Sequence, residues 1–224
     1  MQPRLSIVMP VLDEAATIVA ALQTLAPLRA QGVEVIVVDG RSADGTAEAA
    51  AALADCVLVA PRGRARQMNA GAAQARAEHL LFLHADTTLP ASAVPAIEAA
   101  LRDAAWGRFD VEIAGRASLL ELVAAMMNWR SRASGIATGD QAMFMTRAEF
   151  MVVGGFPEQP LMEDIEMSKR LRARSRPACL AERVVTSGRR WERHGVWRTI
   201  ALMWRLRLLY WLGVAPERLA RSYR

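Results

Sequence analysis

Short apolar runs alternate with segments of helical spacing in the first half of the chain. Four runs predict strands: Leu5–Val11, Val33–Val38, Val57–Val59 and Leu80–Leu83. Between them, helices are predicted over Glu14–Leu28 and Asp44–Leu53. Strands that alternate with helices through short connections predict an α/β fold, with a mostly parallel sheet and helices on both faces. Ligands of such sheets bind at the carboxyl ends of the strands.

The alternation becomes less regular after Asp86. Helices are predicted over Ala91–Ala104, Ala117–Arg132, Asp164–Arg174 and Val196–Leu212, and strands over Phe109–Ile113 and Ala142–Thr146. Glycines and a proline at residues 154–157 predict a loop. We find no repeat and no linker. We therefore expect one α/β domain over residues 1–195 and a helical extension over 196–224, packed on that domain or on a second subunit of a homo-oligomer.

Composition indicates one well-packed domain with an uneven charge. The chain has 224 residues, of which 53% are hydrophobic, so long disordered tracts are excluded. The net charge is +5, yet 20 acidic and 13 basic residues precede Lys169, whereas 3 acidic and 15 basic residues lie from Lys169 onward. The acidic part suits a bound cation, and the basic part suits phosphates or an anionic surface. A general preference for arginine explains the basic part equally well, because Lys169 is the only lysine.

Cysteine use and the apolar runs predict a cytoplasmic protein. Cys56 and Cys179 lie in short apolar runs and are predicted to be buried free thiols in a reducing compartment. No signal peptide is visible, since Leu5–Val11 lacks a basic leader. Thr199–Val214 is shorter than the roughly 20 apolar residues of a membrane span and carries two arginines. We expect no nucleic-acid partner and leave open a peripheral contact with the inner membrane face.

Three acidic clusters follow predicted strands, where side chains point into the crevice at the strand ends. These are Asp39, Asp86 and the pair Glu163-Asp164. Asp39 precedes a glycine-containing turn that opens a helix, and its carboxylate could accept from a base N–H or a ribose hydroxyl. On that segment alone, a capping turn without a ligand is the simpler interpretation. Three such clusters in the acidic part of the chain together indicate a site.

Two further segments suggest a diphosphate and a cation. His84 and Asp86 are two positions apart, so in an extended segment both side chains face one side, which suits Mg²⁺ or Mn²⁺ shared with phosphate. Residues 61–69 read as a basic loop leading into a helix, and arginine forks suit a diphosphate. The alternatives are a structural histidine and a solvated charge run.

In this order, the motifs resemble those of family 2 glycosyltransferases with the GT-A fold. The resemblance spans residues 5 to about 174 and is carried by the opening strand, the turn after Asp39, the segment Phe82–Asp86 in place of an Asp-x-Asp metal motif, and Gly154–Phe156 followed by Glu163-Asp164. Among family members, the chain most resembles short bacterial proteins, some linked to arsenosugar synthesis. Residues 83–86, 139–141 and 219–224 carry this second resemblance.

The resemblance implies transfer of a sugar, with inversion, from a nucleoside diphosphate sugar to an acceptor hydroxyl. The donor would be a uridine diphosphate sugar, and the acceptor a small molecule or a lipid-linked one. Asp164 is implied as the catalytic base beside Glu163, and Mg²⁺ or Mn²⁺ is expected on Asp86, His84 and His194. Donor contacts are expected from Pro10, Asp13, Glu14, Asp39, Arg41, Arg64, Arg66, Asn69 and Gln141.

Three departures from the family pattern keep other functions open. Asp13 stands where the family commonly has Asn, Gly40 replaces a second Asp, and His84 replaces the first Asp of the metal motif. A module that binds a nucleotide sugar without turnover is therefore the main alternative. A nucleotidyltransferase is disfavoured, because no second basic glycine-rich loop follows the first strand. The apolar stripe of the helix predicted over Ala117–Arg132 is expected in the core, on the acceptor side or in an oligomer contact.

Overall fold

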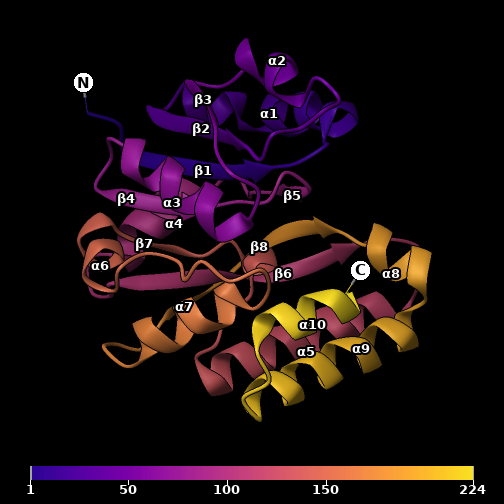
Figure 1. Cartoon of the computed structure of the whole chain (residues 1–224). Helices are drawn as coiled ribbons and strands as arrows, with labels where there is room; N and C mark the ends of the chain where they lie inside the picture. Colours follow the sequence, from indigo (N-terminus) through magenta and orange to yellow (C-terminus); the bar gives the residue numbers. More distant parts are fainter. Residues whose placement is uncertain (1, 224) are drawn as a thin grey trace.

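The computed structural model describes residues 2–223, and its centre is an eight-stranded sheet in the order β3-β2-β1-β4-β7-β6-β8-β5 (Figure 1). The strands are β1 (Leu5–Val11), β2 (Val33–Asp39), β3 (Cys56–Val59), β4 (His79–Phe82), β5 (Thr87–Thr88), β6 (Trp106–Ala114), β7 (Phe144–Thr146) and β8 (Ala178–Ser187). Strands β1 to β4 are mutually parallel, and β8 is parallel to β6. Strand β7 is antiparallel to β4 and β6, and β5 is antiparallel to β8. The sheet is mostly parallel, as predicted.

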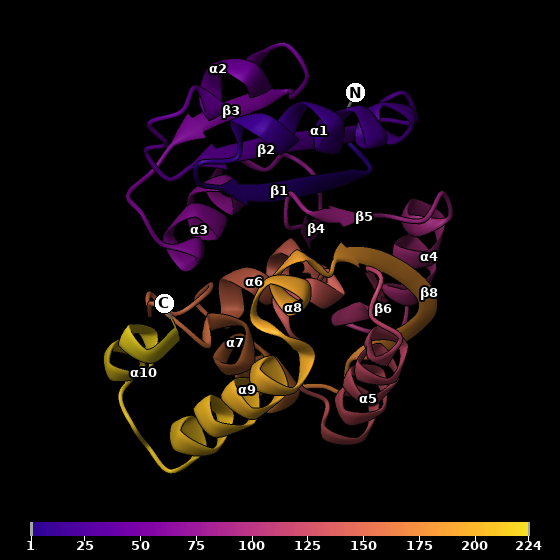
Figure 2. The same cartoon turned by 90° about the vertical axis from the view of Figure 1, so that its right-hand side faces the viewer.

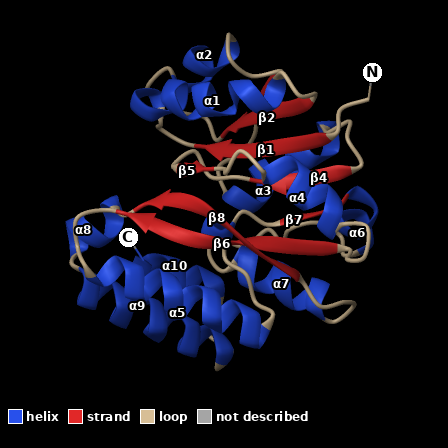
Figure 3. Cartoon of the chain, turned by 180° about the vertical axis from the view of Figure 1, so that it is seen from behind, coloured by secondary structure: helices blue, strands red, loops and turns tan. Residues whose placement is uncertain are grey.

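Helices cover both faces of this sheet (Figures 2 and 3). They are α1 (Ala15–Arg29), α2 (Thr46–Ala51), α3 (Arg64–Gln74), α4 (Ala93–Ala100), α5 (Leu119–Ser134), α6 (Arg147–Val152), α7 (Glu163–Arg172), α8 (Arg189–His194), α9 (Val196–Trp211) and α10 (Pro216–Tyr223), with a short 3-10 helix η1 (Gly139–Gln141). The predicted strands and helices of the first half are confirmed within a few residues at each end. Strand β8, the second half of the β6–β8 pair, was not predicted.

An apolar layer lies on each face of the sheet, between the strands and the helices that cover that face. Along β1 the side chains alternate, so that Ile7 and Met9 pack with α1, α2, α4 and α5, whereas Val8 packs with α3, α6 and α7. This alternation explains why the strand reads as a continuous apolar run: both of its faces are buried.

Helix α3 lies unusually close to the sheet. A Cβ atom added at Gly71 would fall 2.4 Å from Val8 Cγ1 and 2.9 Å from Val38 Cγ2, so only glycine allows this approach. The helix begins at Arg64, three residues into the segment expected to be a basic loop, and that expectation was wrong for Arg64, Arg66 and the residues up to 69. The close packing positions the amino end of α3 beside the strand ends that face the site.

The C-terminal helices pack on the domain. Leu206 of α9 and Leu219 of α10 are buried in one cluster with Leu161, Met162 and Ile165, which lie just before and within α7. Treating residues 196–224 as a separate extension stays a prediction. No helix within residues 2–223 is long and apolar enough to cross a membrane.

The two cysteines differ from expectation in one respect. Cys56 and Cys179 are free, as predicted, but each is only half-buried. The reason is their position: Cys56 begins β3, which is the edge strand of the sheet, and Cys179 lies in the part of β8 whose side chains stay partly exposed.

Candidate functional site

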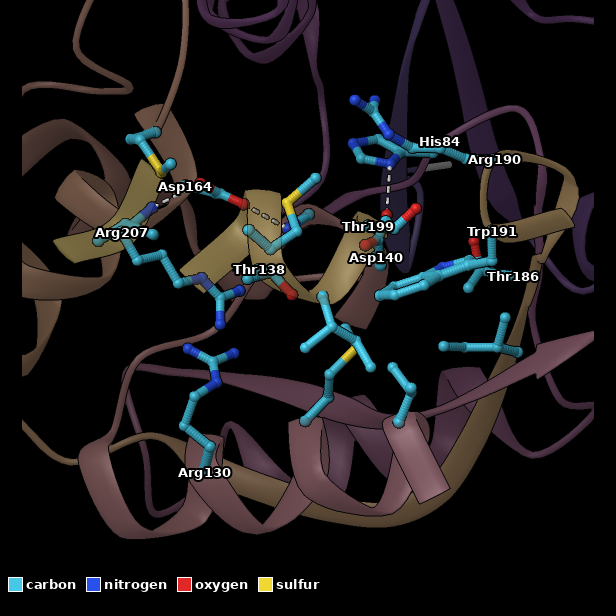
Figure 4. A pocket seen from close by; sticks show the side chains of 18 of the residues that line it. His84, Arg130, Thr138, Asp140, Asp164, Thr186, Arg190, Trp191, Thr199 and Arg207 are labelled. Atoms are coloured by element: carbon cyan, nitrogen blue, oxygen red, sulfur yellow. Dashed lines mark hydrogen bonds and ion pairs between the residues drawn. The ribbon is translucent and has the colours of Figure 1, made fainter. Parts of the chain in front are cut away.

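A cavity of about 420 Å³ opens at the ends of strands β4, β6 and β8 (Figure 4). Helices α3, α5, α7, α8, α9 and α10 and the 3-10 helix η1 also contribute to its walls. Five residues predicted from the sequence line it: Arg64, His84, Asp86, Glu163 and Asp164. Segments far apart in the chain therefore bring two of the three predicted metal residues, His84 and Asp86, into one space with the acidic pair Glu163-Asp164.

Asp164 is held in place by two backbone N–H groups. Its Oδ2 accepts from Gly139 N at 2.9 Å and its Oδ1 accepts from Ile165 N at 2.7 Å. Each oxygen retains a second lone pair, and the side chain is only partly buried, so the carboxylate can accept from a ligand in the cavity. The first turn of α7 thus presents a positioned hydrogen-bond acceptor.

The side chain of Glu163 points in a different direction from that of Asp164. Its side chain is buried, and its Oε1 lies 3.5 Å from Nη1 of Arg64, which reaches across from α3. Burial and the adjacent Asp164 raise the pKa of Glu163, while Arg64 opposes the rise. Burial disfavours the charge of Arg64 as well, but Glu163 and the other acidic groups around it outweigh burial and raise its pKa. The two acidic residues therefore occupy distinct environments, one paired with arginine and one facing the cavity.

His84 contacts an acidic residue that was missing from the predicted site. Its Nδ1 lies 3.5 Å from Oδ1 of Asp140 in η1 (Figure 4). Burial would raise the pKa of Asp140, but the hydrogen bond from His84 and the charges of His84, Arg64 and Arg207 lower it. The neighbouring Gly139 leaves room for the imidazole, because a Cβ there would fall 2.5 Å from His84 Cε1. The signal for Asp140 was present in the sequence, since it lies directly beside Gln141.

Two loops after β1 and β2 are joined beside the carboxyl end of the sheet. Asp13 donates from its backbone N–H to Ser42 Oγ at 2.8 Å and accepts from Ala43 N at 3.1 Å. Glu14 donates from its N–H to Thr46 Oγ1 at 2.8 Å. These bonds hold both loops in one fixed arrangement.

Asp39 is the last residue of β2 and precedes the second of these two loops. Its side chain is buried and accepts from Ser42 N at 2.9 Å and from the Ser42 hydroxyl. These bonds close a turn on Ser42 but do not cap α2, which begins at Thr46, so the role of Asp39 in donor binding stays a prediction. Pro10 is half-buried on β1, and Arg41 is exposed with a φ of 65°. These residues form a separate group from the cavity lining.

The remaining predicted residues have partners within the protein or lie elsewhere. Arg66 pairs with Glu158 at 2.9 Å, and the side-chain amide of Asn69 bonds both backbone groups of Phe156. Gln141 is fully buried, with its Oε1 3.3 Å from Thr138 N. His194 is exposed at the end of α8, outside the set of described residues that line the cavity.

Sequence reasoning missed two arginines that line the cavity. Arg130 projects from α5 and Arg207 from α9 (Figure 4). Of the apolar stripe expected on α5, Val123 is buried in the core, whereas Met126 and Trp129 are exposed residues that line the cavity. The sequence did not distinguish them, because α5 also carries Arg132 and α9 also carries Arg198 and Arg205.

Comparison with known proteins decides the family. The profile described as Glycosyl transferase family 2 matches residues 6–149. The chain belongs to glycosyl transferase family 2. No curated protein matches this glycosyltransferase.

Solved structures share its fold. A mannosyltransferase, PcManGT from Pyrobaculum calidifontis in complex with GDP-Man and Mn²⁺, has a TM-score of 0.68 at 20% identity, covering 100% of this chain and 69% of that one. S. aureus TarS 1-349 in complex with UDP has a TM-score of 0.65 at 20% identity, covering 84% of this chain. The match spans 60% of the TarS chain, and TarS 1-349 with UDP-GlcNAc gives a TM-score of 0.60 at 18% identity, covering 84% of this chain and 58% of that one. This glycosyltransferase therefore has a GT-A fold.

The cavity of the glycosyltransferase offers ligands that fit a divalent cation shared with a diphosphate. Within residues 2–223, no group of three or more His, Cys, Asp or Glu residues is arranged to hold a metal ion alone. Mg²⁺ usually takes only one or two carboxylates from the protein and completes its shell with phosphate and water. Asp86 meets that need, because its side chain is exposed to the cavity and bonded only weakly, at 3.4 Å, by Thr87. The imidazole of His84 suits Mn²⁺ as a second ligand.

Proposed function

We propose that this glycosyltransferase moves a sugar from a nucleoside diphosphate sugar to an acceptor hydroxyl with inversion, and that Asp164 is the catalytic base. The environment of Asp164 is the observation that supports this role, because two backbone N–H groups fix a carboxylate that faces the cavity. In the proposed step Asp164 removes the hydroxyl proton, the oxygen bonds to the anomeric carbon, and the bond to the diphosphate breaks. A single displacement inverts that carbon.

The donor is proposed to lie along the joined loops at β1 and β2, with its diphosphate directed at the cavity. Asp39 would exchange its bond to the Ser42 hydroxyl for a bond to the nucleoside. Arg64 lines the cavity from the first turn of α3, and its guanidinium group is proposed to contact the diphosphate. UDP, UDP-GlcNAc and GDP-Man occur in the similar structures, so those structures do not identify the nucleobase of the donor. Uridine is proposed from the family resemblance.

Asp86 and His84 are proposed to hold Mg²⁺ or Mn²⁺. The Mn²⁺ in the PcManGT complex supports this assignment. A bound cation would neutralise charge on the departing diphosphate. His84 is kept in place by Asp140 at 3.5 Å, which fixes the orientation of the ring. The predicted contribution of His194 would require the exposed α8 segment to move.

The experiment compares Asp164→Asn with Glu163→Gln. The first variant should keep donor binding and lower turnover at least about a hundredfold, the scale of a positioned base. The second should cost less, because Glu163 is directed at Arg64. Proton NMR of the product should show the anomeric configuration opposite to that of the donor. Near-normal turnover of Asp164→Asn, or a retained configuration, would refute the mechanism.

A binding module without turnover remains the competing proposal, because His84 replaces an acidic residue of the metal motif. Titration with UDP-GlcNAc and with GDP-Man in the presence of Mn²⁺, followed by an assay of donor hydrolysis, separates the two. Binding without any hydrolysis of either donor supports the module. The arsenosugar-linked subgroup, the lipid-linked or small-molecule acceptor and the cytoplasmic location stay predictions from the sequence.

A further inference from the structure

Two arginines face the cavity without partners. The Nε and Nη2 atoms of Arg130 are buried and make no hydrogen bond within the part of the chain that the structure describes. Arg207 likewise forms no side-chain hydrogen bond or ion pair with residues 2–223. In Figure 4 the two guanidinium groups, from α5 and α9, face each other across one end of the cavity. Arginine side chains in proteins are rarely buried unless paired, so this arrangement calls for an explanation.

The surroundings penalise both charges. Burial, followed by repulsion from Arg207, lowers the pKa of Arg130 to about 10. Burial also lowers the pKa of Arg207. Arginine side chains are charged at neutral pH. Asp164 offsets part of this penalty for both arginines, and an anion bound between or beside them would offset more of it.

We propose that Arg130 and Arg207 form an anion subsite for the acceptor, which is an amphiphile with a phosphate or carboxylate group attached to an apolar body. The inference rests on the proposed transferase function and names the substrate class of the same cavity. Arginine forks bind phosphate and carboxylate groups through paired hydrogen bonds. Apolar side chains continue the wall around the pair: Met126, Met127, Met203 and Trp204.

The position of the pair assigns the anion to the acceptor rather than to the donor. The residues proposed to hold the nucleoside lie on the loops after β1 and β2, whereas Arg130 and Arg207 come from α5 and α9, which lie away from those strands (Figure 1). The charge of Asp164 acts on both arginines and opposes the lowering of their pKa values, so the pair lies within electrostatic reach of the proposed base. An anion held there places the rest of the acceptor beside Asp164.

The test is a calorimetric titration with three probes that share one apolar chain: hexyl phosphate, hexanoate and hexanol. The wild-type protein should bind both anions at least about tenfold more tightly than hexanol, the scale of a charge-assisted hydrogen bond. Arg130→Met and Arg207→Met should each remove most of that preference. Arg205→Met is the matched control on the same helix, because Arg205 is exposed, and it should retain the preference.

Three results would overturn the inference. The first is equal affinity of the wild-type protein for hexyl phosphate and hexanol, and the second is unchanged preference in both Arg130→Met and Arg207→Met. The third is displacement of hexyl phosphate by saturating UDP or GDP with Mn²⁺, which would assign the pair to the donor diphosphate. The titration needs no sugar donor, so its outcome is independent of whether Asp164→Asn impairs transfer.

A second experiment distinguishes a lipid headgroup from a soluble acceptor as the source of the anion. If a lipid headgroup supplies the phosphate, the wild-type protein should co-sediment with vesicles that contain phosphatidate, whereas Arg130→Met should stay in the supernatant. A soluble acceptor is indicated if hexyl phosphate binds and the vesicles do not. Inorganic phosphate that binds as tightly as hexyl phosphate would overturn the amphiphilic part of the proposal.

Discussion

Replacing Arg130 by methionine should stabilise the ligand-free protein. Methionine keeps the flexible apolar stem and removes the charge that burial and Arg207 disfavour. Burial and Arg207 lower the pKa of Arg130 from its usual range to about 10, which at about 1.4 kcal/mol per pH unit corresponds to a penalty of about 3 kcal/mol. Allowing for the partial exposure of the side chain, we expect a gain of about 2 kcal/mol and a rise in Tm of roughly 4–8 °C for a chain of this size.

The sign of this effect follows from proton linkage. Because the folded state binds the Arg130 proton less tightly than the unfolded state, the penalty is present throughout the neutral range and would be relieved only as the pH rises above about 10. Substitution is therefore a better test than titration with base.

Differential scanning calorimetry at neutral pH and low phosphate should show the rise in Tm for Arg130→Met and little change for Arg205→Met, whose arginine is exposed. Adding hexyl phosphate should raise the Tm of the wild-type protein and leave that of Arg130→Met nearly unchanged. A lower Tm for Arg130→Met without ligand would refute the reasoning, because the arginine would then be paired in solution.

Three further outcomes can be measured directly. Asp39→Ala should weaken binding of the preferred nucleoside diphosphate at least about tenfold, as a lost charge-assisted hydrogen bond would; unchanged calorimetric affinities for both UDP and GDP would contradict the donor placement. Gly139→Ala should lower donor turnover, because its Cβ would fall 2.5 Å from His84 Cε1 and displace the ring; normal turnover would mean that the position of His84 is unimportant. Asp86→Ala and excess chelator should each abolish Mn²⁺-dependent donor hydrolysis, and full activity in chelator would exclude the metal assignment.

The strands that could be predicted are those buried on both faces. Leu5–Val11 was predicted with its observed bounds, because such a strand needs apolar residues at every position. Strand β8 (Ala178–Ser187) was missed, since Glu182 and Arg183 interrupt its apolar pattern and only Val184 and Thr186 are buried. Its pairing with β6 is a tertiary effect that local spacing does not encode.

The candidate site was predictable where a residue's place follows from the end of a strand or helix. Asp86 and Asp164 fall in that class, and both line the cavity. Arg130 and Arg207 do not, because their direction depends on how α5 and α9 rotate when they pack on the domain. Arg66 and Asn69 show the converse: a basic segment suggested ligands, but α3 directs those side chains at Glu158 and the loop around Phe156.

The wide spacing of the cavity lining along the chain has a consequence for biosynthesis. Lining residues extend from Arg64 to Tyr223, while the strands β1 to β4 are complete at Phe82. Domains emerge from the ribosome amino end first, at about 5–20 residues per second. The half of the sheet that is proposed to hold the nucleotide can therefore form seconds before α9 leaves the exit tunnel. A nascent chain in which only β1 to β4 have formed could sequester a sugar nucleotide. It would lack both Asp164 and the wall that orders an acceptor. The reactive arrangement therefore arises only as the final helices dock.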